Sequence, residues 1–250
     1  MVTSVASVLG RAANSLGQCA KAVDAKAAPS GLTLLEYERL VGLGIAFDWV
    51  GWARHLLSIS YSNRGRSASD RAYGLNELTR FTFMWTAANA LFARSTIIEL
   101  LDPTAGSKAS ELERFGVLFQ HCGLPTADAN ALEATLHSLL ALPMHVRHFP
   151  WASVNIPPTI LEVIYYKYTV AREQNRGLGK KLLRAATTKT YSHLDLPTLI
   201  YATRNWNIHG VLLSSSFRGT RKKFNVWIDT INMALARVLE GTAIALHKAI

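Results

Sequence analysis

The sequence predicts an all-α protein, a helical bundle of long antiparallel helices with shorter helices inserted between them. Apolar residues recur at three- and four-residue steps in almost every long segment, which is the period of a helix rather than of a strand. No hairpin dipeptide separates runs of β-branched residues. With 250 residues, of which 49% are hydrophobic, the chain is long enough to bury one large core.

Two long helices are expected in the first half of the chain. Thr33 and Glu36 have the spacing of a capping box, and the apolar residues after them predict a helix that continues to about Ser58. A second helix is expected over residues 71–101, with Asp102-Pro103 to stop it. The predicted core positions are Leu40, Leu43, Phe47, Val50 and Leu57 in the first helix, and Leu78, Phe81, Trp85, Ala88 and Phe92 in the second.

The second half of the chain is expected to hold shorter helices and one long final helix. Pro197 suits the first position of the helix that precedes the last, with Asp195 as its cap. The final helix places Phe224, Trp227, Ile231, Leu235, Val238 and Leu246 on one side. The expected ranges are 110–121, 127–142, 158–173 and 178–189 for the shorter helices and 221–248 for the last.

Residues 1–31 differ in composition from the rest of the chain. They are rich in Ala and Ser and carry more Lys and Arg than acidic residues, which is typical of a flexible or partly helical leader and also of a mitochondrial presequence. We expect the leader, which makes residues 32–250 a single all-helical domain.

The composition argues against several classes of protein. Cys19 and Cys122 are the only cysteines, too few for a disulfide framework, and their surroundings lack the spacing of a zinc site. The most hydrophobic regions are too short to span a membrane, because they are interrupted by Asp48, Arg54, Arg80 and Arg94. We therefore expect a cytoplasmic protein that uses no metal or other cofactor and no membrane.

The excess of positive charge lies entirely in the second part of the chain. Residues 1–140 contain 12 Lys and Arg against 12 Asp and Glu, whereas residues 141–250 contain 15 against 5. A basic region of this size attracts polyanions and supplies phosphate contacts, which points to a nucleic-acid partner. A solvated basic face and a docking surface for an acidic protein are the alternatives.

The strongest candidate for an active site is the segment Arg204-Asn205-Trp206-Asn207-Ile208-His209-Gly210. Asn205 and His209 are one helical turn apart, and the long side chain of Arg204 can reach toward the same groove. An imidazole exchanges protons near neutral pH, a guanidinium holds a phosphate through paired hydrogen bonds, and an amide orients either group. Trp206 is expected to belong to the core.

The spacing from arginine to histidine has little specificity by itself. A second pair, Arg114 and His121, has a similar spacing and lies in the charge-neutral part of the chain. Its arginine is followed by Phe115, whereas Arg204 is followed by a polar residue. The polar neighbour therefore distinguishes the candidate site.

The pattern Arg-Asn-x-x-x-His-Gly ahead of one long final helix resembles the HEPN superfamily of α-helical proteins, whose hallmark is Arg-(polar)-x(3–5)-His. Residues 81–92, Phe-Thr-Phe-Met-Trp-Thr-Ala-Ala-Asn-Ala-Leu-Phe, resemble the first helix of many members. The resemblance covers about residues 71–250, the HEPN-like core. Members paired with a nucleotidyltransferase antitoxin often carry Tyr two places after the histidine, where this chain has Val211, so a stand-alone member is expected.

The resemblance implies a metal-independent endoribonuclease with a composite active site at a homodimer interface, in a toxin, phage-defence or RNA-processing role. It implies that Arg204, Asn205 and His209 are catalytic and act with their copies from a second chain, cleaving RNA by attack of the 2′-hydroxyl. A regulatory partner protein would fit the toxin and defence roles. The candidate contacts to the RNA backbone are Lys180, Lys181, Arg184, Arg218, Arg221, Lys222 and Lys223.

Two other classes remain open at this point. A non-catalytic HEPN-like module would bind a nucleotide or nucleic acid in the same pocket without forming a product. A structural dimerisation domain would use neither Arg204 nor His209, and the histidine would simply interact with the last carbonyls of its helix. An RNA-cleavage assay in EDTA separates the three classes.

Overall fold

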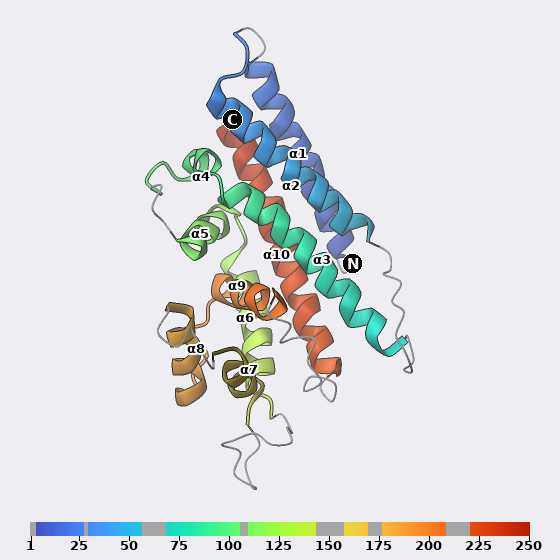
Figure 1. Ribbon diagram of the computed structural model, residues 1–250, viewed down its shortest axis with the longest axis vertical. Helices are drawn as coiled ribbons and strands as arrows, with labels where there is room; N and C mark the ends of the chain where they lie inside the picture. Colours follow the sequence, from blue (N-terminus) through green and yellow to red (C-terminus); the bar gives the residue numbers. More distant parts are fainter. Residues whose placement is uncertain are drawn as a thin grey trace. The chain divides into compact units, whose positions relative to one another are not determined.

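The computed structural model describes residues 4–27, 30–56, 69–105, 110–143, 158–169, 177–208 and 221–250. All the elements of secondary structure in these ranges are helices, and none is a strand, which confirms the predicted all-α class (Figure 1). None of the described helices is long and apolar enough to cross a membrane. The helices are α1 (Val5–Ala27), α2 (Leu34–His55), α3 (Ser69–Phe92), α4 (Ser95–Leu101), α5 (Glu111–His121), α6 (Thr126–Leu140), α7 (Ile160–Thr169), α8 (Gly177–Thr188), α9 (Leu196–Ile208) and α10 (Arg221–Ala249).

The chain divides into two compact units. Unit 1 comprises residues 1–125 and 231–250, and unit 2 comprises residues 126–230. The last helix, α10, therefore contributes its beginning to unit 2 and the rest of its length to unit 1.

In unit 1, α1 packs along α2, and α2 packs along α3 (Figure 1). The segment expected as a leader thus contains a helix, α1, whose inward face is buried at Leu9 and Leu16 among other positions. The capping box at the start of α2 is confirmed. The Glu36 N–H donates to Thr33 Oγ1 at 3.2 Å, and the Thr33 N–H donates to the Glu36 carboxylate at 2.8 Å.

The expectation of one helix over residues 71–101 is wrong, because the chain breaks between α3 and α4. Arg94 is extended, with φ −96° and ψ 115°, and its carbonyl accepts hydrogen bonds from the N–H groups of Ile97 and Ile98. The break lets both isoleucines enter the core. Ile97 packs closely on α2, where a Cβ at Gly42 would lie only 2.6 Å from its Cδ1.

Most of the predicted core positions of unit 1 are buried, including all five predicted in residues 71–101. Leu40 is half-buried, and Leu57 lies outside the described residues. The prediction is wrong for Phe47, since 43% of it is exposed. Its ring lies over α1, where it comes within 3.5 Å of the place that a Cβ would take at Gly17. Phe47 thus covers a neighbouring helix instead of entering the core.

The last helix approaches the end of α5 very closely in unit 1. A Cβ at Gly241 would lie 1.7 Å from the carbonyl oxygen of Cys122, so only a glycine fits there. The hydroxyl of Thr242 donates to the carbonyl of Leu118 at 3.3 Å. Cys122 and Cys19 are both buried and free, and burial raises the pKa of the Cys19 thiol to about 11.

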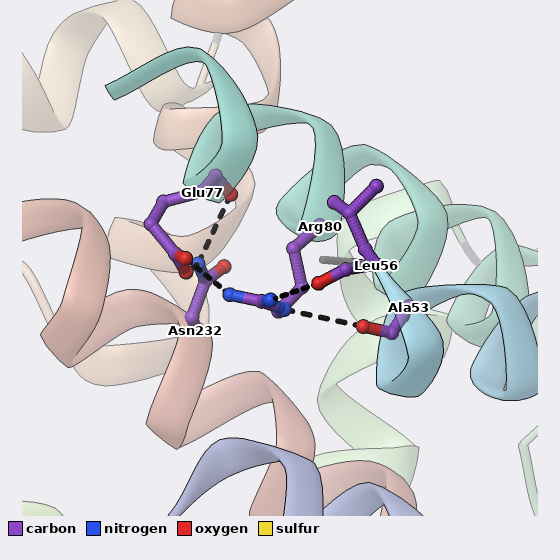
Figure 2. Close-up of polar contacts among 5 residues, drawn as sticks. All are labelled: Ala53, Leu56, Glu77, Arg80 and Asn232. Atoms are coloured by element: carbon purple, nitrogen blue, oxygen red, sulfur yellow. Dashed lines mark hydrogen bonds and ion pairs between the residues drawn. The ribbon is translucent and has the colours of Figure 1, made fainter. Parts of the chain in front are cut away.

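A polar cluster joins the end of α2 to α3 and α10 (Figure 2). Arg80 donates from Nε to the carbonyl of Ala53 at 3.1 Å and from Nη2 to the carbonyl of Leu56 at 2.8 Å, so it caps the last turn of α2. It also forms an ion pair with Glu77. The fully buried amide of Asn232 donates to the Glu77 backbone carbonyl and side-chain carboxylate, both at 3.0 Å.

Unit 2 consists of α6 to α9 and the first part of α10. The predicted cap at Asp195 is confirmed, since its carboxylate accepts from the Thr198 N–H at 3.1 Å. The helix begins at Leu196, so Pro197 is its second residue rather than its first. The Leu196 N–H donates to the Glu133 carboxylate at 2.7 Å, which holds the start of α9 against α6.

The remaining helices of unit 2 follow the predicted ranges closely. α7 ends at Thr169, and the rest of the range expected as 158–173 lies outside the described residues. The Thr159 N–H donates to the Glu162 carboxylate at 2.6 Å, and the Glu162 N–H donates to Thr159 Oγ1 at 3.3 Å, so a further capping box starts α7. An ion pair from Glu162 to Lys189 ties this helix to the end of α8.

Candidate functional site

The last turn of α9 carries the first two residues of the candidate site. Arg204 is half-buried, and Asn205 is buried with 6% of it exposed. The helix ends at Ile208. His209 and Gly210, which the sequence places next, lie outside the described residues.

Arg204 and Asn205 are in direct contact. Nη1 of Arg204 donates to Oδ1 of Asn205 at 2.7 Å, a short bond because the donor carries a charge. Cζ of Arg204 also lies 5.9 Å from the centre of the Tyr201 ring. The amide oxygen is neutral, and this bond orients the guanidinium. The pair can therefore present a fixed cation to an anionic group such as a phosphate.

A second pair of contacts holds α9 to the first part of α10. The indole nitrogen of Trp227 donates to Thr203 Oγ1 at 3.2 Å, and the same hydroxyl donates to the carbonyl of Leu199 at 2.8 Å. Trp206 is fully buried, as expected for a core residue, and its ring centre lies 5.9 Å from that of Trp227. These contacts fix the helical turn on which Arg204 lies.

Sequence reasoning did not identify Thr203 as a positioning residue. Threonine is neutral in a helix interior, and no spacing rule joins residue 203 to residue 227. The only available signal is a small polar residue on a face that is otherwise apolar. That signal is too common to select one threonine from the many in the chain.

Of the seven basic residues expected to contact RNA, three lie on α8. Lys180 and Arg184 are exposed and one helical turn apart, so they share a face. Lys181 is half-buried, and its Nζ donates to Thr198 Oγ1 at 3.3 Å. Lys181 is thus brought to α9, about 9 Å along the helix axis from Arg204.

The other four basic residues are described less fully. Arg218 lies outside the described residues. Arg221, Lys222 and Lys223 form the first turn of α10, where the structure describes their backbone. Their role as RNA contacts stays a prediction.

The second arginine and histidine pair has a different environment in unit 1. Nη1 of Arg114 donates to the carbonyl of Ala93 at 3.4 Å, where the chain turns after α3. His121 is exposed in the last turn of α5. Arg114 therefore stabilises a chain turn, and this pair serves as an internal reference for the candidate site.

No cluster of His, Cys, Asp or Glu side chains suited to a metal ion occurs within the described ranges. Comparison of the chain with protein-family models, with curated proteins and with solved structures gives no match. We therefore infer the function from the chemistry of the site.

Proposed function

We propose that this protein is a metal-independent endoribonuclease of the HEPN type, with Arg204, Asn205 and His209 as its catalytic residues. The observation that carries the proposal is the bond from Arg204 to the buried Asn205, which precedes His209 by four residues in the chain. An arginine oriented by a neighbouring amide has the fixed planar geometry that recognition of a phosphate requires. The basic excess of residues 141–250 supports a polyanionic substrate.

The proposed reaction uses two copies of the chain. His209 of one protomer takes the proton of a ribose 2′-hydroxyl, and the 2′-oxygen attacks the adjacent phosphorus. Arg204 holds the nonbridging oxygens as negative charge builds on them. The bond from phosphorus to the 5′-oxygen breaks, and His209 of the partner subunit donates a proton to that oxygen. The products are a 2′,3′-cyclic phosphate and a 5′-hydroxyl, and DNA is not cleaved because it has no 2′-hydroxyl.

The test is cleavage of labelled RNA in EDTA by the wild-type protein and two variants. Arg204→Ala and His209→Ala should each lower the cleavage rate by about 10²- to 10⁴-fold, the usual size of general acid–base and charge-stabilising contributions. His121→Ala is the matched control, because this exposed histidine also follows an arginine but lies in unit 1. Its cleavage rate should equal that of the wild type.

The outcomes separate the proposal from its alternatives. Salt-dependent RNA binding that both variants weaken, with no product from any protein, would identify a non-catalytic binding module. Intact RNA together with unchanged binding in all variants would leave only a structural role. Mapping the fragment ends completes the test, since a 3′-hydroxyl product would contradict the proposed chemistry.

A further inference from the structure

One of the three cations on α8 is held in a fixed position against α9. Helix α8 contains Lys180, Lys181 and Arg184 and no acidic residue. Lys180 and Arg184 are exposed, whereas Lys181 is half-buried and its Nζ donates to Oγ1 of Thr198 at 3.3 Å. None of the ion pairs found among the described residues involves Lys181. The structure therefore distinguishes Lys181 from its neighbours, which the sequence alone treats alike.

The partner of Lys181 is a neutral group that is almost completely buried. Only 1% of Thr198 is exposed, and its hydroxyl accepts the hydrogen bond from the ammonium group. The other lysine that binds α7 or α9 in unit 2, Lys189, is paired with the carboxylate of Glu162 instead. A half-buried ammonium group has lost part of its hydration, and a hydroxyl replaces that loss only partly. Lys181 is therefore suited to bind an anion.

The anchors of Lys181 and Arg204 lie on one side of α9. Thr198 and Asn205 are seven residues apart, which is two helical turns, so their side chains point the same way about 10 Å apart along the axis. Both are buried, and each accepts a hydrogen bond from a cation, Thr198 from Lys181 and Asn205 from Arg204. Hydrogen bonds to a phosphate oxygen are about 3 Å long, so this spacing suits two phosphates of one strand better than a single phosphate.

An aromatic ring lies between the two anchors. Tyr201 follows Thr198 by three residues and precedes Asn205 by four, which places it on the same side of the helix. It is half-buried, and the centre of its ring lies 5.9 Å from Cζ of Arg204. Cations that follow a backbone, with an aromatic ring between them, are typical of proteins that bind single-stranded nucleic acid. The bases of a duplex are paired and stacked, so they are not open to such a ring.

Two carboxylates lie at the start of α9, and both are bound to the helix. Asp195 accepts from the Thr198 N–H at 3.1 Å, and Glu133 accepts from the Leu196 N–H at 2.7 Å. Each therefore interacts with the positive end of the helix dipole. Neither forms an ion pair with Lys181 within the part of the chain that the structure describes. The ammonium group thus remains suited to an added phosphate.

We propose that Lys181, positioned by Thr198, binds a second backbone phosphate of the substrate, and that the substrate is single-stranded RNA of at least three nucleotides. The inference rests on the proposed function, in which Arg204 holds the phosphate that is cleaved. The strand runs along α9 from Arg204, past the ring of Tyr201, to Lys181. Its test measures binding of strands that cannot be cleaved, so it is independent of catalysis.

The first experiment uses 2′-O-methyl oligoribonucleotides of two to six nucleotides, which have no 2′-hydroxyl to attack the phosphorus. Each competes with a longer fluorescent strand for the wild-type protein and for Lys181→Gln. A dinucleotide has one phosphate, so both proteins should bind it equally. The wild type should gain about fivefold in affinity once the second phosphate is reached, because at 0.1 M salt one single-strand contact contributes about 0.7 to the salt slope. Lys181→Gln should lack this step.

Lys180→Gln is the matched control, because it removes the same charge from the next residue of α8, where the side chain is exposed. Lys181→Gln should lower the slope of the logarithm of affinity against the logarithm of salt concentration by about 0.7 on a hexanucleotide. Lys180→Gln should lower the slope by less. Equal losses in both variants would show a general electrostatic attraction and overturn the second phosphate site.

Thr198 tests the positioning of Lys181. Thr198→Val keeps the shape of the side chain and the backbone bond to Asp195 but removes the hydroxyl. It should weaken hexanucleotide binding, by less than Lys181→Gln does, and leave dinucleotide binding unchanged. Thr198→Ser should restore the affinity, because it restores the hydroxyl. Wild-type affinity in Thr198→Val would contradict the positioning role, and circular dichroism on heating checks that each variant is folded.

The results separate this site from the proposed function. If the wild type cleaves RNA but Lys181→Gln shows the same length dependence, the second phosphate site is wrong and the proposed function stands. If the length step disappears in Lys181→Gln but no protein cleaves RNA, the site stands and the catalytic proposal is wrong. A duplex of six base pairs should compete more weakly than the single strand, and equal competition would contradict the assignment to single-stranded RNA.

Discussion

The two units of this protein treat a partly buried arginine differently. In unit 1, Arg80 pairs with the carboxylate of Glu77 and caps the end of α2, so its charge is balanced and its donors serve the fold. In unit 2, Arg204 donates to the neutral amide of Asn205, which orients the guanidinium. An arginine bonded to a carboxylate and two carbonyls serves the fold, whereas one oriented by an amide suits the binding of an anion.

The largest loss of stability should come from removing Arg80, the structural arginine. Arg80→Ala leaves the carboxylate of Glu77 partly buried without its counter-charge and removes two donors from α2, so it should lower the free energy of unfolding by about 3 kcal/mol. Loss of the bond from Arg204 to the neutral amide of Asn205 should cost about 1 kcal/mol in Arg204→Ala. Urea denaturation followed by circular dichroism measures both. Equal losses would remove the distinction between the two arginines.

A loss of stability of similar size concerns the core beneath the candidate site. Trp206→Ala leaves a large cavity beside Trp227 and should lower the free energy of unfolding by about 3 kcal/mol. Trp206→Phe should cost about 1 kcal/mol, because the buried indole nitrogen makes no hydrogen bond within the part of the chain that the structure describes. A phenylalanine variant as unstable as the alanine variant would show that the N–H contributes to stability.

A smaller loss of stability should result from adding a methyl group where α10 and α5 approach each other closely in unit 1. Gly241→Ala should lower the free energy of unfolding by about 2 kcal/mol, because the backbone at Cys122 must move away from the new methyl group. Gly116→Ala is the matched control, since it lies within α5 with open space at its Cβ position. The control should raise the melting temperature, because alanine favours a helix over glycine by about 1 kcal/mol.

The smallest loss of stability concerns the partly exposed ion pair of Glu162 and Lys189 in unit 2. Burial of Glu162 raises the pKa of its carboxyl, but hydrogen bonds from Lys189 and Thr159 outweigh burial and hold the pKa below its usual value. A lowered pKa contributes stability that is present above the unfolded-state pKa of about 4.3 and is lost as the pH falls through the folded-state value. Because Lys189 is half exposed, the loss should be about 0.5 kcal/mol.

Glu162→Gln isolates that pH dependence. The variant should lose less stability than the wild type between neutral pH and the acid range, as measured by urea denaturation at a series of pH values. Parallel curves for the two proteins would show that this ion pair contributes nothing to the acid sensitivity of unit 2.

The local pattern of the sequence was sufficient for features that depend on neighbouring residues. The capping box of Thr33 and Glu36, the cap at Asp195 and the buried positions of α3 all follow from spacings within one or two helical turns. The contact between Arg204 and Asn205 joins adjacent residues, so the sequence could indicate it as well. Such features are predictable because the helix itself determines which side chains are neighbours.

Features that join distant parts of the chain were decided by tertiary structure alone. The break at Arg94 contains neither glycine nor proline, and it exists because Ile97 packs on Gly42 of another helix and Ile98 is buried beside it in the chain. The same holds for the exposure of Phe47, for the link from Asn232 to Glu77 and for the hydrogen bond between Trp227 and Thr203. The sequence by itself determined where most helices form, because periodicity and caps are local, but not where α3 ends. Only packing decided which faces meet, since many pairings of amphipathic helices satisfy the same pattern.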